Sequence, residues 1–251
     1  MISFFDANCV VGRGAAPLPG AILEPEEILA EMDRVGIERA LATHALATAT
    51  DILGGNDRIS QIAARHRRFD PCYVIVPHHN GEMPEGDALV RYLEEGGARA
   101  ARMCPAQHRY PAGETWCGRT YATLAEAGIP VLIESRTNQI TWGEVDEVMT
   151  AHPTLTLVLL RVNWRTERTV FALLAKHPNL KIETELYLPH RGIADITQRF
   201  GARRLIFGSG MPVYSAGAAM ALILYAEIAD ADKQRIASTN LGEILRKGGR
   251  R

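Results

Sequence analysis

The sequence has few cysteines, no long apolar run and no excess of charge, and each of these shortages excludes a class of protein. Its four cysteines, none in a Cys-x-x-Cys pair, are too few to form a disulfide framework in a chain of 251 residues. The opening residues MISFFDANCVVG lack the basic and apolar segments of a signal peptide, and no apolar run is long enough for a membrane helix. We therefore expect a cytoplasmic protein with reduced thiols and no membrane partner.

Charge and composition favour a small-molecule partner. The chain carries 28 Lys plus Arg against 29 Asp plus Glu, a formal net charge of −1, so no overall field attracts a nucleic acid. The sequence also has no low-complexity tract, flexible linker or block of like charge. With 47% hydrophobic residues the chain can bury a large core, and we expect one domain that spans residues 1–251.

Eight short apolar runs alternate with amphipathic stretches. The runs are SFFDAN, RALATH, PCYVIV, ARAARM, PVLIES, LTLVLLR, LKIETE and RLIFGS, with segments such as EPEEILAEMDRVG and TYATLAEAG between them. Gly36, Gly128 and Gly201 each follow an amphipathic stretch, as a glycine that ends a helix does. This alternation predicts a parallel sheet covered by helices, most simply a single (β/α)8 TIM barrel, with a doubly wound open sheet as the alternative. Residues 216–228 and 230–245 are predicted as two further helices packed over the side of the barrel.

Polar and charged residues follow the apolar interiors of the predicted strands. LVLL is followed by Arg161 and PVLI by Glu134, so these predicted strands have apolar interiors and end at a charged residue. In a barrel these ends share one pocket. The candidates are Asp6, Asn8, His44, His78, Arg102, Cys104, Glu134, Arg136, Arg161, Asn163, Glu183, Glu185, Ser209 and Met211.

Five segments, in order along nearly the whole chain, resemble the amidohydrolase-2 (amidohydrolase-related) family. They are FFDANCVVGR, GGARAARMCP, AEAGIPVLIES, FGARRLIFGSGMPVY and NLGEIL, of which the fourth is similar to the specific closing motif F-G-x-x-R-x-x-F-G-S-D-x-P. The resemblance implies a TIM barrel and, by family habit, a homodimer. It also implies that the metal-ligand positions fall on Asn8, Val10, Glu134, Arg161 and Gly210. Valine and glycine side chains cannot bind a metal, and an arginine adds a fixed positive charge, so we expect no metal and no cofactor.

The expected site is therefore a metal-free, charged pocket for a small anion, because arginines at strand ends can donate paired hydrogen bonds to a carboxylate or phosphate. Hydrolysis of a lactone or amide, or a lyase step, would suit it, with Glu134 or Glu183 as general base. Glu183 and Glu185 point to the same side of a strand; they either divide acid and base roles or only neutralise the arginines. The predicted catalytic residues are Glu134, Arg161 and Glu183, and the predicted substrate-binding residues are Asp6, Asn8, Arg102, Arg136, Asn163, Glu185, His78 and His108.

Other interpretations stay open. A catalytically inactive pseudoenzyme could keep the barrel as a binding or assembly partner. A metal hydrolase with relocated ligands could use the loop histidines His78, His79, His108 and His190. Cys9 or Cys104 would be a nucleophile only if a base lowered the pKa of its thiol, and no motif indicates one.

Overall fold

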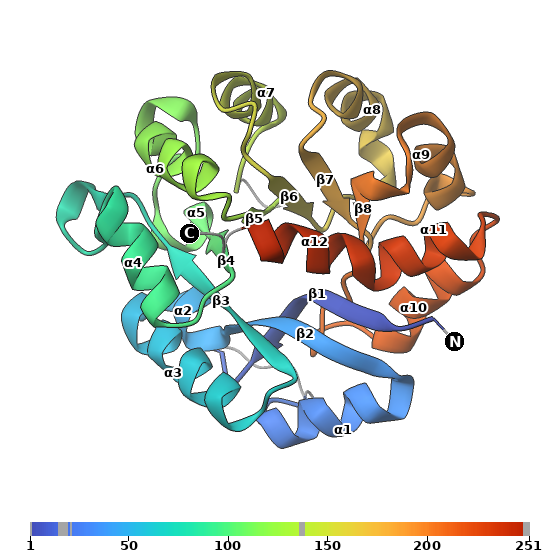
Figure 1. Cartoon of the computed structure of the whole chain (residues 1–251), viewed down its shortest axis with the longest axis horizontal. Coiled ribbons are helices and arrows are strands. Elements are labelled where there is room, and N and C mark those ends of the chain that lie inside the picture. The colour runs from blue at the N-terminus through green and yellow to red at the C-terminus, as the bar shows by residue number, and fades with distance from the viewer. Residues whose placement is uncertain (1, 15–19, 21, 136–138, 248–251) are drawn as a thin grey trace.

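The computed structural model describes residues 2–14, 20, 22–135 and 139–247. In this part of the chain eight strands form one sheet in sequence order, and every neighbouring pair from β1 to β8 is parallel. The strands are β1 (Phe4–Val11), β2 (Ile37–His44), β3 (Phe69–Ile75), β4 (Ala100–Met103), β5 (Val131–Glu134), β6 (Leu157–Leu160), β7 (Leu180–Glu183) and β8 (Leu205–Ile206). Figure 1 shows them ringed by helices.

The helices fill the intervals between the strands. They are α1 (Pro25–Val35), α2 (Ala45–Ala49), α3 (Ile52–Arg65), α4 (Asp87–Glu95), α5 (Pro105–His108), α6 (Glu114–Ala127), α7 (Trp142–Ala151), α8 (Glu167–Lys176), α9 (Gly192–Phe200), α10 (Ala216–Leu224), α11 (Asp230–Gln234) and α12 (Asn240–Lys247). The predicted terminal glycines are confirmed, because Gly36, Gly128 and Gly201 all lie just past a helix with φ of 88°, 68° and 85°. Among the described residues, every helix falls short of the length and apolarity that crossing a bilayer requires.

Hydrogen bonds between β1 and the segment that directly follows β8 close the sheet into a barrel. The Ala7 N–H donates to the Phe207 carbonyl at 3.0 Å, and the Val10 N–H donates to the Met211 carbonyl at 2.9 Å. The doubly wound open sheet considered above has two free edges and cannot make these bonds. The predicted single (β/α)8 TIM barrel is therefore confirmed.

Side chains alternate between two apolar cores, one inside the barrel and one between the strands and the helices. On β5, Val131 and Ile133 belong to the outer core while Leu132 belongs to the inner one. The inner core also contains Phe5, Ala7, Leu41, Cys72, Ala100, Val158, Leu160 and Ile206. Burial of both faces explains why these strands are almost uniformly apolar.

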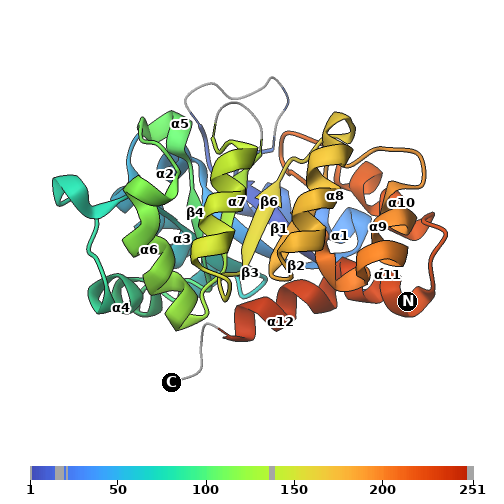
Figure 2. The ribbon, with the colours of Figure 1, turned by 90° about the horizontal axis from the view of Figure 1, so that it is seen from above.

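The C-terminal helix corrects one prediction. Residues 230–247 continue through a π-helical turn into α12, which lies across one end of the barrel and not along its side (Figure 2). Leu241, Ile244 and Leu245 of α12 pack against the inner core. This helix closes the end where the strands begin, so the other end, where the strands finish, carries the polar groups.

Candidate functional site

A bulge in β1 turns Asn8 toward the barrel interior. The register of β1 on β2 shifts between Asp6 and Cys9, so Asn8 departs from strict alternation. Asp6 stabilises the bulge, because its Oδ1 accepts the N–H groups of Asn8 at 2.9 Å and Ser209 at 2.8 Å, and its Oδ2 accepts the Ser209 hydroxyl. Asp6 therefore clamps β1 to the segment after β8, and the amide of Asn8 is left to bind other side chains.

Arg102 and Glu134 extend from the neighbouring strands β4 and β5. Each stands two residues beyond an inner-core residue, Ala100 and Leu132, so both side chains continue the inward row. An Nη atom of Arg102 donates to Glu134 Oε1 at 2.9 Å, and the other donates to Asn8 Oδ1 at 3.1 Å. The guanidinium of Arg102 is buried, and it fixes Glu134 and Asn8 with respect to each other.

Arg161 enters the same cluster from the residue after β6. Its φ of 56° is left-handed, a conformation that disfavours a residue with a side chain, and its N–H donates to Glu183 Oε2 at 3.2 Å. The guanidinium lies 3.6 Å from Glu134 Oε1 and 3.4 Å from Glu185 Oε1. Tyr214 covers it, with its ring centre 5.5 Å away. The contact with Tyr214 was not predicted, because it joins two segments far apart in the chain.

Glu183 and Glu185 supply two buried carboxyl groups, both turned to the pocket side as predicted. One oxygen of Glu183 accepts the Glu185 N–H, and Glu185 Oε2 accepts from Asn8 Nδ2 at 2.6 Å. Two glycines leave room for them, because a Cβ on Gly208 would overlap the Glu183 carboxyl and a Cβ on Gly210 would lie 2.5 Å from Glu185 Oε1. The motif Gly-Ser-Gly after β8 thus makes space for the carboxyls of β7.

Three acidic groups of the cluster, those of Asp6, Glu183 and Glu185, have raised pKa values. Burial raises the pKa of Asp6, which its hydrogen bonds with Ser209 and Asn8 partly offset. Burial raises the pKa of Glu183 well above its usual value, and the charge of Glu185 raises it further. Burial also raises the pKa of Glu185, against the opposing charge of Arg161. A closely spaced carboxyl pair with these properties retains a proton that an exposed pair would lose.

Two members of the cluster reach solvent at the open end of the barrel. The Arg161 side chain is 21% exposed and the Glu134 side chain is 15% exposed, whereas the Glu185 side chain is fully buried. Two of the buried atoms, Glu185 Oε1 and Arg161 Nε, make no hydrogen bond among the described residues. The arrangement can bind an anion through Arg161 and exchange protons through carboxyl groups.

Three of the predicted site residues have local partners outside this cluster. The ring of His78 lies 3.0 Å from a Glu85 oxygen, His108 Nε2 lies 2.9 Å from the Ala47 carbonyl oxygen, and Asn163 accepts the Arg165 N–H at 2.9 Å. Arg136 lies outside the described residues. The cluster therefore unites Asp6, Asn8, Arg102, Glu134, Arg161, Glu183 and Glu185 from the predicted set.

The cysteines and the serine near the site are structural in character. Cys9 and Cys104 are buried, and burial raises the pKa of both thiols, which opposes the thiolate form that a nucleophile needs. The Ser209 hydroxyl donates to Asp6 and accepts the Met211 N–H at 3.0 Å. Ser209 therefore holds the end of the last strand in place.

An eight-stranded parallel barrel with a cluster of charged side chains at the carboxyl ends of its strands is a TIM barrel. A family model described as Amidohydrolase matches residues 14–246, and the chain belongs to this family, the amidohydrolase-2 family that its motifs resemble. A comparison with curated proteins gave no match.

Solved structures share the fold at low sequence identity. An uncharacterised TIM-barrel protein from Bordetella bronchiseptica is 19% identical with a TM-score of 0.76, and the match covers 99% of this chain and 100% of that one. A 2,6-dihydroxybenzoate decarboxylase in complex with 2,6-dihydroxybenzoate is 15% identical with a TM-score of 0.76, covering 98% and 100%. A dihydroxybenzoic acid decarboxylase from Polaromonas, with bound manganese and an inhibitor, is 15% identical with a TM-score of 0.72, covering 98% and 97%.

The residues of the charged cluster do not suit a divalent cation of the kind bound in the last of these structures. Among the described residues no three His, Cys, Asp or Glu side chains form a group that could hold a metal ion. Glu134 is engaged by the guanidinium groups of Arg102 and Arg161, and Glu185 by that of Arg161. The loop histidines His78, His79, His108 and His190 form no such group either within the part of the chain that the structure describes. Protein cations thus take up the carboxylates that a metal would need.

Proposed function

We propose that the chain is a metal-independent lyase that removes the carboxylate group of a small anionic acid. The observation that carries this proposal is the partly exposed pair of Arg161 and Glu134, which contacts the buried carboxyls of Glu183 and Glu185. Two proteins of similar fold are decarboxylases of dihydroxybenzoic acids, which favours a lyase step over hydrolysis of a lactone or amide.

Arg161 binds the carboxylate of the ligand in this proposal. Its planar guanidinium can donate two parallel hydrogen bonds to a carboxylate, and a fifth of its side chain is accessible from the open end of the barrel. Arg102 is buried and acts through Glu134 and Asn8, which it holds in place by hydrogen bonds. Burying the ligand next to these charges strengthens its interaction with them.

The reaction needs a proton donor, and we assign this role to Glu185, with Glu183 sharing its proton. The bond between the ligand carbon and its carboxylate breaks, the electron pair stays on the carbon, the carbon takes the proton, and carbon dioxide leaves. Burial raises the pKa of Glu185, and its Oε1, which lies 3.4 Å from Arg161 Nε, makes no hydrogen bond among the described residues. Solvent then restores the proton. Glu134 is the general base for a ligand hydroxyl and returns that proton to the product.

The proposal of a metal-independent reaction rests on the ion pairs of Arg102 and Arg161 with Glu134 and Glu185. The guanidinium groups supply the positive charge near the ligand, so no divalent ion has a part in these steps. The remaining predictions stay proposals: Asp6, Asn8, Asn163, His78, His108 and Arg136 as substrate-binding residues, one domain over residues 1–251, a small-molecule ligand with no nucleic acid, and a cytoplasmic location. All four cysteines are free and buried, which supports a reducing compartment.

The test uses a panel of hydroxylated benzoic acids, with carbon dioxide release and product formation as readouts. We expect Arg161→Ala to lower kcat/KM by about 100-fold or more. Arg161→Lys should retain part of the activity, because lysine keeps the positive charge but cannot donate two parallel hydrogen bonds to a carboxylate. Glu185→Gln should lower kcat by about 100-fold with little change in KM. In heavy water the product should carry deuterium at the carbon that lost the carboxylate. Dialysis against a chelator should leave turnover unchanged.

Different results point to different failures. Unchanged activity of Arg161→Ala overturns the anion-binding assignment. Activity that disappears with a chelator and returns with manganese supports a metal hydrolase or lyase with relocated ligands. Ring opening of a lactone or amide without carbon dioxide release identifies a hydrolase. Saturable binding that Arg161→Ala abolishes, with no turnover of any compound, identifies the pseudoenzyme.

A further inference from the structure

Among the described residues, the side chain of Arg161 has ion pairs but no hydrogen bond. Its guanidinium lies 3.6 Å from an oxygen of Glu134 and 3.4 Å from one of Glu185, and its buried Nε has no hydrogen-bond partner. The guanidinium of Arg102, by contrast, donates to Glu134 and Asn8 at 2.9 Å and 3.1 Å. Hydrogen bonds fix the plane of a guanidinium, whereas ion pairs at these distances depend little on direction. The two carboxylates therefore attract Arg161 without setting its orientation.

The ring of Tyr214 provides a contact that can set this orientation. Its centre lies 5.5 Å from the guanidinium carbon of Arg161. The face of an aromatic ring attracts a cation at up to about 6 Å, and a guanidinium packs flat on such a face. A contact of this kind restrains the guanidinium through its own face. The N–H donors at its edge then remain available for a ligand.

The backbone that carries Tyr214 is anchored to the ends of the strands. The carbonyl of Met211 accepts the Val10 N–H at 2.9 Å, which ties the segment to β1. The N–H groups of Val213 and Tyr214 donate to the carbonyl of Gly210 at 3.0 Å and 3.2 Å. These bonds form a tight turn directly after β8. The ring of Tyr214 thus stands on backbone that is fixed to the same strand ends as the charged cluster.

Two ordinary reasons for the position of a tyrosine do not apply to Tyr214. Within the described part of the chain, its hydroxyl has no hydrogen-bond partner, so no polar contact draws it to this place. The residue is 39% exposed, so full burial does not hold it there either. The contact of its ring with Arg161 therefore accounts best for where the side chain lies.

We propose that Tyr214 is a positioning residue that holds the guanidinium of Arg161 ready for a ligand anion. The inference rests on the part of the proposed function in which Arg161 binds an anion, and it does not depend on the reaction that follows. A guanidinium that is held in place before the ligand arrives loses less conformational entropy on binding. The contact is present before and during the reaction, so it should strengthen binding and leave kcat unchanged.

Proton–nitrogen NMR spectra of the whole chain test the contact without any ligand. The Nε–H of Arg161 is buried, so its proton is protected from exchange with water, and its signal is the one that Arg161→Lys removes. An aromatic ring shifts the signals of nuclei over its face. The Arg161 signal should therefore move in Tyr214→Leu, which keeps an apolar side chain without a ring, and stay nearly in place in Tyr214→Phe.

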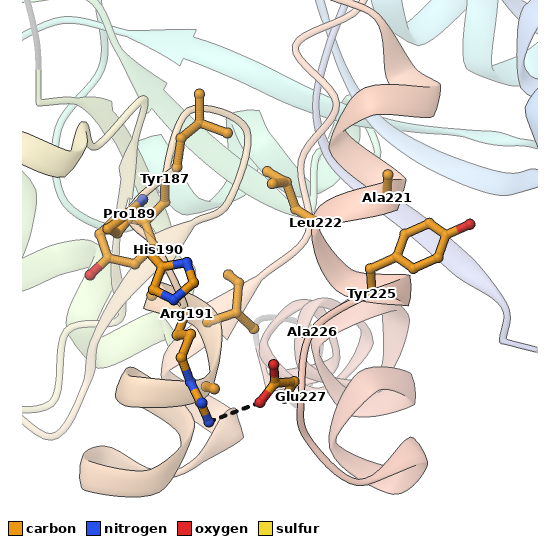
Figure 3. Close-up of a pocket in the computed structure, with 13 residues that line it drawn as sticks. Tyr187, Pro189, His190, Arg191, Ala221, Leu222, Tyr225, Ala226 and Glu227 are labelled. Carbon is orange, nitrogen blue, oxygen red and sulfur yellow. Dashed lines mark ion pairs between the residues drawn. The ribbon is translucent and has the colours of Figure 1, made fainter.

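Tyr225→Leu is the matched control for both measurements. Tyr225 is a tyrosine that is 86% exposed and lines a groove between the segment before α9 and the end of α10, which Arg161 does not line (Figure 3). Its substitution should leave the Arg161 signal and ligand binding unchanged. Circular dichroism spectra and thermal melts show whether each variant is folded.

Titration calorimetry with the hydroxylated benzoic acids of the panel tests the role in binding. Tyr214→Leu should weaken their binding by about 5-fold, the contribution of one such ring contact, whereas Tyr214→Phe should bind as the natural chain does. For an acid that is turned over, KM should rise by the same factor with kcat unchanged.

The outcomes separate this inference from the proposed function. An Arg161 signal that does not move in Tyr214→Leu, or a Tyr214→Phe variant that binds as weakly as Tyr214→Leu, overturns the positioning role. Binding that requires Arg161 but tolerates Tyr214→Leu also overturns this inference and leaves the anion-binding assignment intact. Binding that Arg161→Ala leaves unchanged, or no binding of any panel acid to the natural chain, overturns the anion-binding assignment and this inference with it.

Discussion

Gly210→Ala tests the idea that a glycine after β8 makes room for a carboxyl of β7. Gly210 has φ of 67°, and a Cβ there would lie 2.5 Å and 2.6 Å from the two carboxyl oxygens of Glu185. Glu185 cannot move aside freely, because its Oε2 accepts a hydrogen bond from Asn8 and its side chain is fully buried. The substitution should therefore disturb both the backbone and the charged cluster.

Two costs combine in the expected loss of stability. The left-handed backbone disfavours alanine by about 1–2 kcal/mol. Forcing a methyl group into a filled, buried space adds about 1–3 kcal/mol. The free energy of unfolding should thus fall by about 2–5 kcal/mol in total. Gly36→Ala separates the two costs, because Gly36 has φ of 88° and a Cβ there would meet no atom within 4 Å.

Urea unfolding at neutral pH measures the free energies, and a double-mutant cycle isolates the contact. In a Glu185→Ala background the overlap is gone, so Gly210→Ala should cost no more than Gly36→Ala does in the natural chain. The coupling between positions 185 and 210 should then be about 1–3 kcal/mol. Equal losses for Gly210→Ala and Gly36→Ala in the natural chain would refute the assignment of this glycine to the carboxyl of Glu185.

Two further predictions concern buried charges. Because burial raises the pKa of Glu183, its contribution to stability is complete below the usual glutamate value of 4.5 and is lost as pH rises through the raised pKa. In urea titrations above pH 4.5, the free energy of unfolding of the natural chain should therefore fall relative to that of Glu183→Gln, which cannot ionise. A difference that stays constant with pH would contradict the raised pKa. Arg204 donates hydrogen bonds to the carbonyl oxygens of Leu174, His177 and Pro178, where α8 ends. Arg204→Ala should therefore lower the free energy of unfolding by about 2–4 kcal/mol, whereas the control Arg203→Ala, at an exposed position, should change it little. Equal effects of the two substitutions would show that these hydrogen bonds contribute nothing.

The barrel could be predicted from the sequence because its signals are local and repeated. Apolar runs such as LVLL of β6, each followed by an amphipathic helix, need only neighbouring residues to be recognised. The position of α12 could not be predicted in this way. Its apolar residues Leu241, Ile244 and Leu245 fit either a side or an end of the barrel, and only packing against the inner core decides between them.

The sequence allowed most residues of the candidate site to be predicted, but not the contacts between them. Strand ends indicated Arg102, Glu134 and Arg161, since the change from apolar to charged residues is visible in the sequence. Their pairing depends on the bulge at Asn8 and on the left-handed turn at Arg161, and neither leaves a clear signal in a single sequence. Loop residues such as His78 were grouped with the site by chain order alone, and their contacts depend on loop conformation.

The balance of charge at the open end of the barrel connects the fold to the proposed chemistry. Four carboxyl groups, those of Asp6, Glu134, Glu183 and Glu185, share the cluster with two guanidinium groups. Full ionisation would leave an excess of negative charge in a region from which water is largely excluded, and this is unfavourable. The raised pKa values of three of these carboxyls relieve the excess by keeping protons bound. In the proposed reaction, a ligand anion bound to Arg161 would add negative charge and so hold these protons more firmly until bond breaking creates a stronger base on the ligand carbon. Proton retention and anion binding are for this reason two consequences of one arrangement.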